Sequence, residues 1–141
     1  MTARTKQNLN AAMVKEALAN AKYMRFAACA RMNEHPEIAR IFQKTADTDR
    51  MDHFRKEFDL ATLCSDDTAN LKTAIRDKGY QVDMYCQFAA QARAEGDLAA
   101  AELFDRIRAE VFHELVDFEA ALQHIKTQAE QEKECTKAAV Q

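Results

Sequence analysis

Glycine and proline are scarce in this sequence of 141 residues, which holds only two glycines and one proline. Both residue types interrupt helices, so their scarcity argues for helices and almost nothing else. Alanine, glutamate, lysine, arginine, glutamine, leucine and methionine dominate instead, and these side chains lose the least entropy in a helix. The composition therefore predicts an all-α protein and not an α/β enzyme.

The sequence also has neither an excess of basic residues nor a long apolar run. The formal net charge is −3. Basic residues do not cluster on one face of any predicted helix, as nucleic-acid binding usually requires. No run of about 18 apolar residues exists to span a bilayer, and no apolar stretch follows the charged start MTARTKQNLN. We therefore expect a soluble, cytoplasmic protein with neither nucleic acid nor membrane as a partner.

Cys-x-x-Cys pairs are absent too. The four cysteines are widely separated, at Cys29, Cys64, Cys86 and Cys135. This spacing supports neither a zinc ribbon nor a thioredoxin-type site. Free thiols in the core or on the surface fit a reducing compartment.

Turn signals divide the chain into four helices, and its length predicts one domain over residues 1–141. The signals are His35-Pro36, the N-cap residues of Ser65-Asp66-Asp67-Thr68, and Glu95-Gly96-Asp97. The predicted helices cover about 5–32, 36–63, 68–94 and 97–127. The polar residues from 128 onward are expected to fray.

The two halves of the chain repeat. The stretch NLNAAMVKEALANAKYMRFAACAR, which begins at Asn8, aligns without gaps on NLKTAIRDKGYQVDMYCQFAAQAR, which begins at Asn70. Identical pairs in this alignment include Leu9/Leu71, Tyr23/Tyr85, Phe26/Phe88 and Arg31/Arg93. A helical hairpin repeated twice is typical of a four-helix bundle with pseudo-twofold symmetry.

A carboxylate interrupts the apolar stripe of the first predicted helix. The stripe, at heptad-like spacing, is Leu9, Met13, Glu16, Asn20, Tyr23 and Ala27. An ionised carboxylate inside a bundle costs several kcal/mol unless it is paired or bound to a metal. Glu16 therefore needs a partner.

The second predicted helix offers such a partner. Asp49 and His53 lie on its apolar face, and Asp52 lies at the border of that face. A carboxylate and an imidazole at positions i and i+4 can bind one cation, and a simple hydrogen-bonded couple is the other interpretation.

The fourth predicted helix contains the spacing Glu-x-x-His, from Glu110 to His113, followed by Glu114. At roughly 100° per residue, Glu110 borders the apolar stripe, His113 lies well round the side and Glu114 is nearer the core. Solvated charge is the other interpretation of Glu110 and His113.

The third predicted helix differs at the position that repeats Glu16, because Lys78 stands there. No carboxylate lies squarely at this place in the stripe. A buried lysine amine could pair with Glu16 or Asp49, and it would then take the place of a metal ion.

Four stretches resemble the rubrerythrin family, specifically its di-iron four-helix domain, over about residues 5–125. They are NLNAAMVKEALANAKYMRF, IARIFQKTADTDRMDHF, MYCQFAAQARAEGDLAAAELF and AEVFHE. The resemblance implies a ferritin-like bundle that reduces hydrogen peroxide or oxygen at two iron ions, with manganese or zinc as other candidates. It lacks the rubredoxin module of many relatives, so an external donor such as a rubredoxin-like protein would deliver the electrons.

The resemblance also implies ligands, because each hairpin of that family contributes a Glu and a Glu-x-x-His. Glu16 matches the first ligand, Asp49 falls at the next Glu position, Asp52 falls at the His position, and His53 comes one residue late. On the fourth helix, local similarity selects Glu110 and His113, whereas the frame counted from Phe104 selects Val111 and Glu114. A π-bulge in that helix could reconcile the two registers. Tyr23 and Tyr85 would orient the ligands from outside the site.

The connection between the halves is short. A second helix of about 28 residues is roughly 42 Å long, and a crossover along it needs about 12 or more extended residues. Only about five are available around Ser65. We therefore expect an up-down-up-down bundle or a domain-swapped homodimer, with residues 1–63 of one chain on 68–127 of the other.

Three functions stay open on the residues alone. The first is a di-iron peroxidase or oxidase, and the second is metal handling without turnover. The third is a metal-free dimeric helical bundle whose di-iron site is degenerate, with paired charges in its place.

Overall fold

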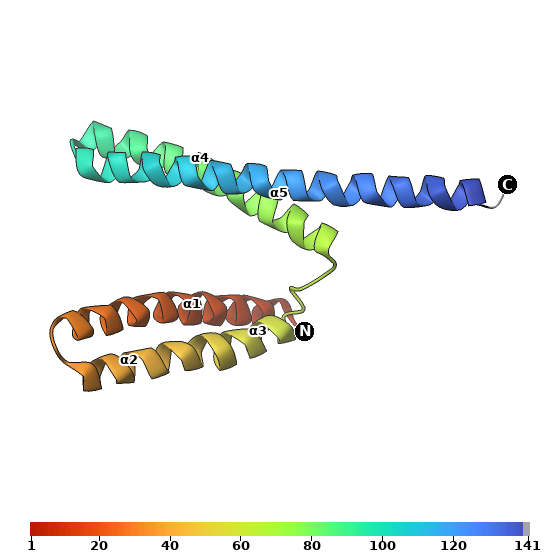
Figure 1. Ribbon diagram of the computed structural model, residues 1–141. Helices are drawn as coiled ribbons and strands as arrows, with labels where there is room; N and C mark the ends of the chain where they lie inside the picture. Colours follow the sequence, from red (N-terminus) through yellow and green to blue (C-terminus); the bar gives the residue numbers. More distant parts are fainter. Residues whose placement is uncertain (140–141) are drawn as a thin grey trace. The chain divides into compact units, whose positions relative to one another are not determined.

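Two helical hairpins make up the part of the chain that the computed structural model describes, residues 1–139, with side chains described for residues 1–136 (Figure 1). This part contains no strand, which confirms the all-α class, and none of its helices has a segment long and apolar enough to cross a membrane. The chain divides between Cys64 and Ser65 into two compact units. We call them the N-terminal hairpin and the C-terminal hairpin.

The N-terminal hairpin packs α1 (Ala3–Met32) against a second helix in three segments, α2 (Pro36–Thr48), the π-helical η1 (Asp49–Phe54) and α3 (Arg55–Leu60). Pro36 is the first residue of α2, as predicted. The second helix ends at Leu60 and not at residue 63, because Thr62 adopts a left-handed backbone with φ of 52°.

The C-terminal hairpin packs α4 (Asp67–Glu95) against α5 (Leu98–Ala139). The Asp66 side chain accepts a hydrogen bond of 2.9 Å from the N–H of Ala69, and Gly96 ends α4 with a φ of 83°. These boundaries confirm the predicted turn signals. The expected fraying from residue 128 is wrong over residues 128–139, where Ala, Glu, Gln and Lys continue α5 without a helix breaker.

Alanines line the seam of both hairpins. The buried apolar residues include Ala27, Ala30, Ala39 and Ala46 in the N-terminal hairpin, and Ala89, Ala92 and Ala101 in the C-terminal one. Side chains this small let two helix backbones approach closely, so each hairpin is held along a narrow seam. Ala27/Ala89, Ala30/Ala92 and Ala39/Ala101 are each 62 positions apart, so the sequence repeat is also a repeat of packing.

Matching aromatic clusters close the turn end of each hairpin. Tyr23, Phe26 and Phe42 have ring centroids 5.4 to 6.2 Å apart. Their counterparts Tyr85, Phe88 and Phe104 have centroids 5.7 to 6.5 Å apart. Such ring pairs contribute about 0.5 to 1.5 kcal/mol beyond the area they bury, so the clusters reinforce the alanine seam.

The alanine seam generates a prediction on stability. Ala27 is fully buried, so Ala27→Leu should force the two helices apart and lower the free energy of unfolding by about 1 to 3 kcal/mol. Ala21→Leu on the exposed side of α1 is the matched control, with a change expected near zero. Urea denaturation followed by circular dichroism measures both, and equal stability of the two variants would contradict the close approach.

Candidate metal site

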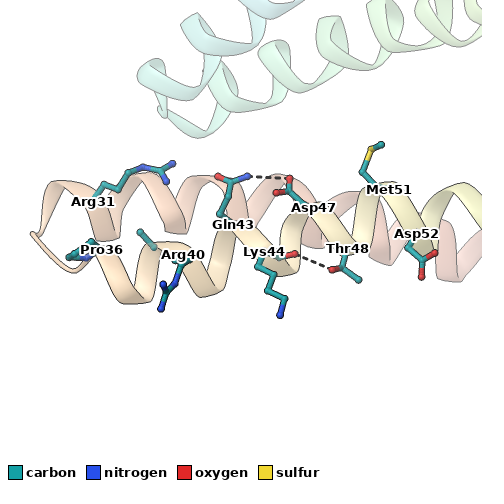
Figure 2. A pocket seen from close by; sticks show the side chains of 10 residues that line it. Arg31, Pro36, Arg40, Gln43, Lys44, Asp47, Thr48, Met51 and Asp52 are labelled. Carbon is teal, nitrogen blue, oxygen red and sulfur yellow. Dashed lines mark hydrogen bonds between the residues drawn. The ribbon is translucent and has the colours of Figure 1, made fainter.

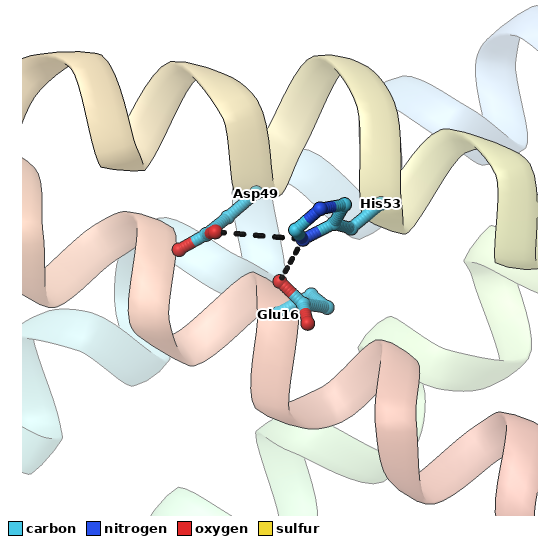
Figure 3. Close-up of side chains that lie close together, drawn as sticks. All are labelled: Glu16, Asp49 and His53. Carbon is cyan, nitrogen blue, oxygen red and sulfur yellow. Dashed lines mark ion pairs between the residues drawn. The ribbon is translucent and has the colours of Figure 1, made fainter.

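Glu16 from α1 meets Asp49 and His53 from η1 in the N-terminal hairpin (Figure 3). His53 Nδ1 lies 3.4 Å from Glu16 Oε2 and 3.7 Å from Asp49 Oδ1. Asp49 is 8 % exposed and is the one buried charged residue of the described chain. The side chains of Glu16 and His53 are 26 % and 49 % exposed, so the cluster is closed at Asp49 and open at His53.

The π turn of η1 aligns the two ligands of the second helix. A π turn closes its hydrogen bonds from i to i+5, so it holds one residue more than an α turn. The sequence alignment placed His53 one residue late, and the turn absorbs that residue, which leaves Asp49 and His53 both facing Glu16. The π-bulge that could have reconciled the two registers of the fourth helix is absent from α5, which is α-helical over Leu98–Ala139.

Asp52 lies outside the cluster. Its carboxylate is 2.7 Å from the ammonium group of Lys56, one turn further along the helix. The hydrogen bond from Lys56 lowers the pKa of the Asp52 carboxyl from its usual value. The two aspartates of η1 therefore have different surroundings. Asp49 is buried, whereas Asp52 forms an ion pair with Lys56 at the surface.

Asn20 ties α1 to the second helix just before η1. Its side-chain amide donates a hydrogen bond of 2.7 Å to the carbonyl oxygen of Ala46, which is fully buried. Asn20 lies one turn after Glu16 on α1, and Ala46 lies one turn before Asp49. This bond holds the two helices at the level of the cluster, so it positions Glu16 opposite Asp49.

The donor set of the cluster suits a transition-metal ion. One ligand atom from each of Glu16, Asp49 and His53 can be chosen so that all three lie within 4.8 Å of one another. Two ligands at about 2.1 Å from one ion lie about 3.0 to 3.4 Å apart at octahedral or tetrahedral angles. The distances of 3.4 and 3.7 Å from His53 Nδ1 lie at or just above that range, so small side-chain movements would bring the three donors onto one ion. Three donors suffice for one ion with open coordination positions, and the hairpin supplies no second set.

The C-terminal hairpin carries an ion pair at the corresponding place. Lys78 Nζ and Glu114 Oε2 are 2.5 Å apart, and Val111 is buried beside them on α5. Asp49 and Val111 are 62 positions apart, whereas His53 and Glu114 are 61 apart, because only the N-terminal hairpin has the extra residue of the π turn. Glu16 contacts His53 just as Lys78 contacts Glu114, which supports this equivalence.

The other predicted residues are described within their own hairpins. Glu110 and His113 are exposed on α5, and the register counted from Phe104 is the one in which the hairpins correspond. Tyr23 stacks on Phe42, and Tyr85 makes the equivalent contact with Phe104. These contacts of the two tyrosines are aromatic packing within each hairpin.

Glu57 is a residue that sequence reasoning missed. It lies one turn beyond His53, and its Oε2 atom is buried without a hydrogen-bond partner within the described chain. The counterpart of Glu57 in the C-terminal hairpin is Phe118, a half-buried core position 61 residues later. In the repeat, Glu57 therefore stands where the C-terminal hairpin has a core phenylalanine. The sequence shows this difference only when the offset of 61 positions beyond the π turn is used.

A shallow groove beside α2 also bears charged groups (Figure 2). Its lining includes the cations of Arg31, Arg40 and Lys44 and the carboxylates of Asp47 and Asp52. The three cations lie toward the turn end of the hairpin and the two carboxylates lie toward η1, so the groove carries charges of both signs.

Comparison of the chain with models of known protein families and with curated proteins found no match to either. The interpretation of the site rests on its donor atoms, their spacing and their burial.

The unpaired carboxylate oxygen of Glu57 generates a prediction on the metal-free protein. Glu57→Leu removes a buried, unsatisfied polar group, so it should raise the free energy of unfolding by about 1 to 3 kcal/mol in the presence of a chelator. Asp59→Leu, at an exposed position of α3, is the matched control with little change expected. Thermal denaturation compares the two, and a melting temperature lowered by Glu57→Leu would contradict the buried, unpaired state of this oxygen.

Proposed function

We propose that this chain is a non-haem iron protein of the rubrerythrin type, which reduces hydrogen peroxide or oxygen in defence against oxidative stress. The observation that carries the proposal is the convergence of Glu16, Asp49 and His53 on one point of the N-terminal hairpin. Carboxylate and imidazole ligands suit iron, manganese and zinc, and of these only zinc lacks redox chemistry, so the proposal takes the iron that the family resemblance implies.

The residues of the hairpin have distinct roles in this proposal. Asp49 and Glu16 would neutralise the charge of a divalent cation, and the imidazole of His53 would complete the donor set. The π turn and the bond from Asn20 to Ala46 would hold those donors in position. The open side at His53, which is half exposed, leaves room for a small oxidant to approach.

The proposed reduction of peroxide requires an electron donor. Reduction of hydrogen peroxide to two water molecules consumes two electrons and two protons, and the described chain contains no cluster of cysteines that could hold an electron carrier. We therefore propose an external one-electron donor such as a rubredoxin-like protein. A cytoplasmic location is part of the proposal and agrees with four exposed cysteines, none of them in a disulfide within the described chain.

One observation favours a second candidate, a metal-free helical bundle that kept the scaffold of a di-iron protein. In the C-terminal hairpin, the ion pair of Lys78 and Glu114 takes the place of a carboxylate and an imidazole. If the N-terminal cluster likewise serves only as a charge pair, loss of Glu16 would alter stability and leave metal content unchanged.

Metal binding by matched variants tests the proposed function. Protein expressed with ample iron should contain iron by elemental analysis, and a Co²⁺ titration followed by visible absorbance should show a ligand-field band. Asp49→Asn and His53→Ala should weaken Co²⁺ binding by more than about tenfold, since loss of a ligand costs at least as much as loss of its support. The matched controls Asp52→Asn and His113→Ala change the same residue types outside the cluster and should bind as the wild type does.

Two results of these metal-binding measurements would contradict the proposal. Wild-type protein without iron and without a Co²⁺ band would favour the metal-free bundle, as would equal binding by Asp49→Asn and Asp52→Asn. Circular dichroism of each variant confirms that the helices are retained. For the iron-loaded wild type, consumption of peroxide in the presence of a chemical reductant should exceed that of the His53→Ala variant.

A further inference from the structure

The open end of the N-terminal hairpin contains a partly enclosed pocket of about 450 Å³, which we call the end pocket. It is lined by Met1, Lys6, Leu9, Asn10, Met13, Leu60, Ala61, Thr62 and Leu63. The pocket therefore lies between the first turns of α1 and the end of α3, and none of Glu16, Asp49 and His53 lines it. A volume of this size is typical of small-molecule sites.

A strained turn forms one wall of the end pocket. The helix α3 ends at Leu60, and Thr62 adopts a left-handed backbone with φ of 52°, a conformation that glycine usually supplies at a helix C-terminus. This conformation is costly for a β-branched residue, and strained residues cluster at ligand sites. The turn folds the chain back, and Leu63 lines the same pocket as Leu60.

The lining of the end pocket is largely apolar, and part of it is exposed. Leu60 and Leu63 are 63 % and 51 % exposed, whereas Met13 is buried. Removal of exposed apolar surface from water is favourable, so an apolar chain in the pocket would be stabilised by contact with the two leucines. Lys6 and Met13 are seven residues apart, so the pocket extends about 10 Å along α1. These dimensions suit an acyl chain of medium length.

Lys6 is the only ionisable side chain among the lining residues. It is exposed and makes no ion pair within the described part of the chain. The side chains of Asn10 and Thr62 also line the pocket and can donate hydrogen bonds. A positive charge and hydrogen-bond donors, with no carboxylate in the lining, favour a ligand with an anionic head group.

The C-terminal hairpin has the opposite charge at the corresponding place. A hollow of about 400 Å³ in that hairpin is lined by Asp67, Asn70, Leu71, Ala74, Phe118 and Ile125. Leu71 is the repeat of Leu9, so the two hollows correspond. Asp67 supplies a carboxylate there, and no cation is among the lining residues. Of these two hollows, only the end pocket suits an anion.

We propose that the end pocket binds an amphipathic carboxylate, such as a free fatty acid of medium chain length. The acyl chain lies against Leu9, Leu60 and Leu63, and the carboxylate lies at the ammonium group of Lys6. This inference goes beyond the proposed function and requires no metal ion. It accounts for both properties of the lining, because the chain covers exposed leucines and the head group pairs with an unpaired cation.

Calorimetric titration of the full-length chain with octanoate tests the inference. A chelator is present throughout, so that a carboxylate cannot bind through a metal ion. Octanol and octyltrimethylammonium have the same chain with a neutral or a cationic head group. We expect saturable binding of octanoate, with octanol bound at least about threefold more weakly and octyltrimethylammonium more weakly still.

Two pairs of variants separate the head group from the chain. Lys6→Glu should weaken octanoate binding by at least about threefold and leave octanol binding unchanged, and Lys22→Glu on the same helix is the matched control. Leu60→Asp should weaken binding of both ligands by more than about tenfold. Leu18→Asp, at an exposed position outside the pocket, should change neither. Circular dichroism confirms that each variant keeps its helices.

Several results would overturn the inference. One is the absence of saturable octanoate binding, and another is equal octanoate binding by the wild type and Lys6→Glu. Binding of the chain to phosphatidylglycerol vesicles without binding of octanoate would assign the surface to a membrane instead. A melting temperature of the ligand-free chain lowered by Leu60→Asp but not by Leu18→Asp, again without octanoate binding, would show that protein covers the pocket. All these measurements exclude metal, so their failure leaves the test of the proposed function unaffected.

Discussion

Asp49 places a carboxylate in a seam whose other buried residues are mostly alanines, and it is almost fully removed from water. A buried carboxylate is costly unless positive charge or hydrogen-bond donors surround it. The nearest groups are the imidazole of His53 at 3.7 Å and, beyond it, a second carboxylate from Glu16. The local geometry of the N-terminal hairpin follows from this constraint. The π turn carries Asp49 and His53, and the bond from Asn20 to Ala46 joins the two helices at the same level of the seam.

The two hairpins show how one packing scheme accommodates different chemistry. Their alanines and aromatic clusters correspond pair by pair, so the scaffold is the same in both. At the level of Glu16, however, the C-terminal hairpin has Lys78 paired with Glu114 and an apolar Val111 in place of the aspartate. Opposite charges satisfy each other there, whereas the N-terminal cluster keeps excess negative charge. That excess is what a cation would neutralise, and it makes the N-terminal hairpin the chemically active half in our proposal.

A one-residue insertion is the physical difference that creates the cluster. In an uninterrupted α-helix, His53 would be displaced by about 100° from the position that Glu114 occupies in the other hairpin. The π turn absorbs the extra residue, so Phe54 at its end and Glu57 beyond it return to the core face. Such turns are frequent at functional sites because they redirect a few side chains without breaking the helix. Here the turn brings an imidazole to a carboxylate of the neighbouring helix.

The sequence by itself determined the helical class, most helix boundaries and the internal repeat, because these depend on local signals. Pro36, Asp66, Gly96 and Asp97 act within one turn of their own positions, and the spacing of apolar residues is visible without a partner. It also singled out Glu16, Asp49 and His53 as polar residues in apolar stripes. That Glu16, Asp49 and His53 meet while Asp52 pairs with Lys56 required the tertiary structure. Which side chains face one another depends on the helical register, and a single π turn shifts that register in a way that periodicity cannot locate. The length of α5 was misjudged for the opposite reason, since polar composition suggested fraying while helix propensity alone sufficed to continue it to Ala139.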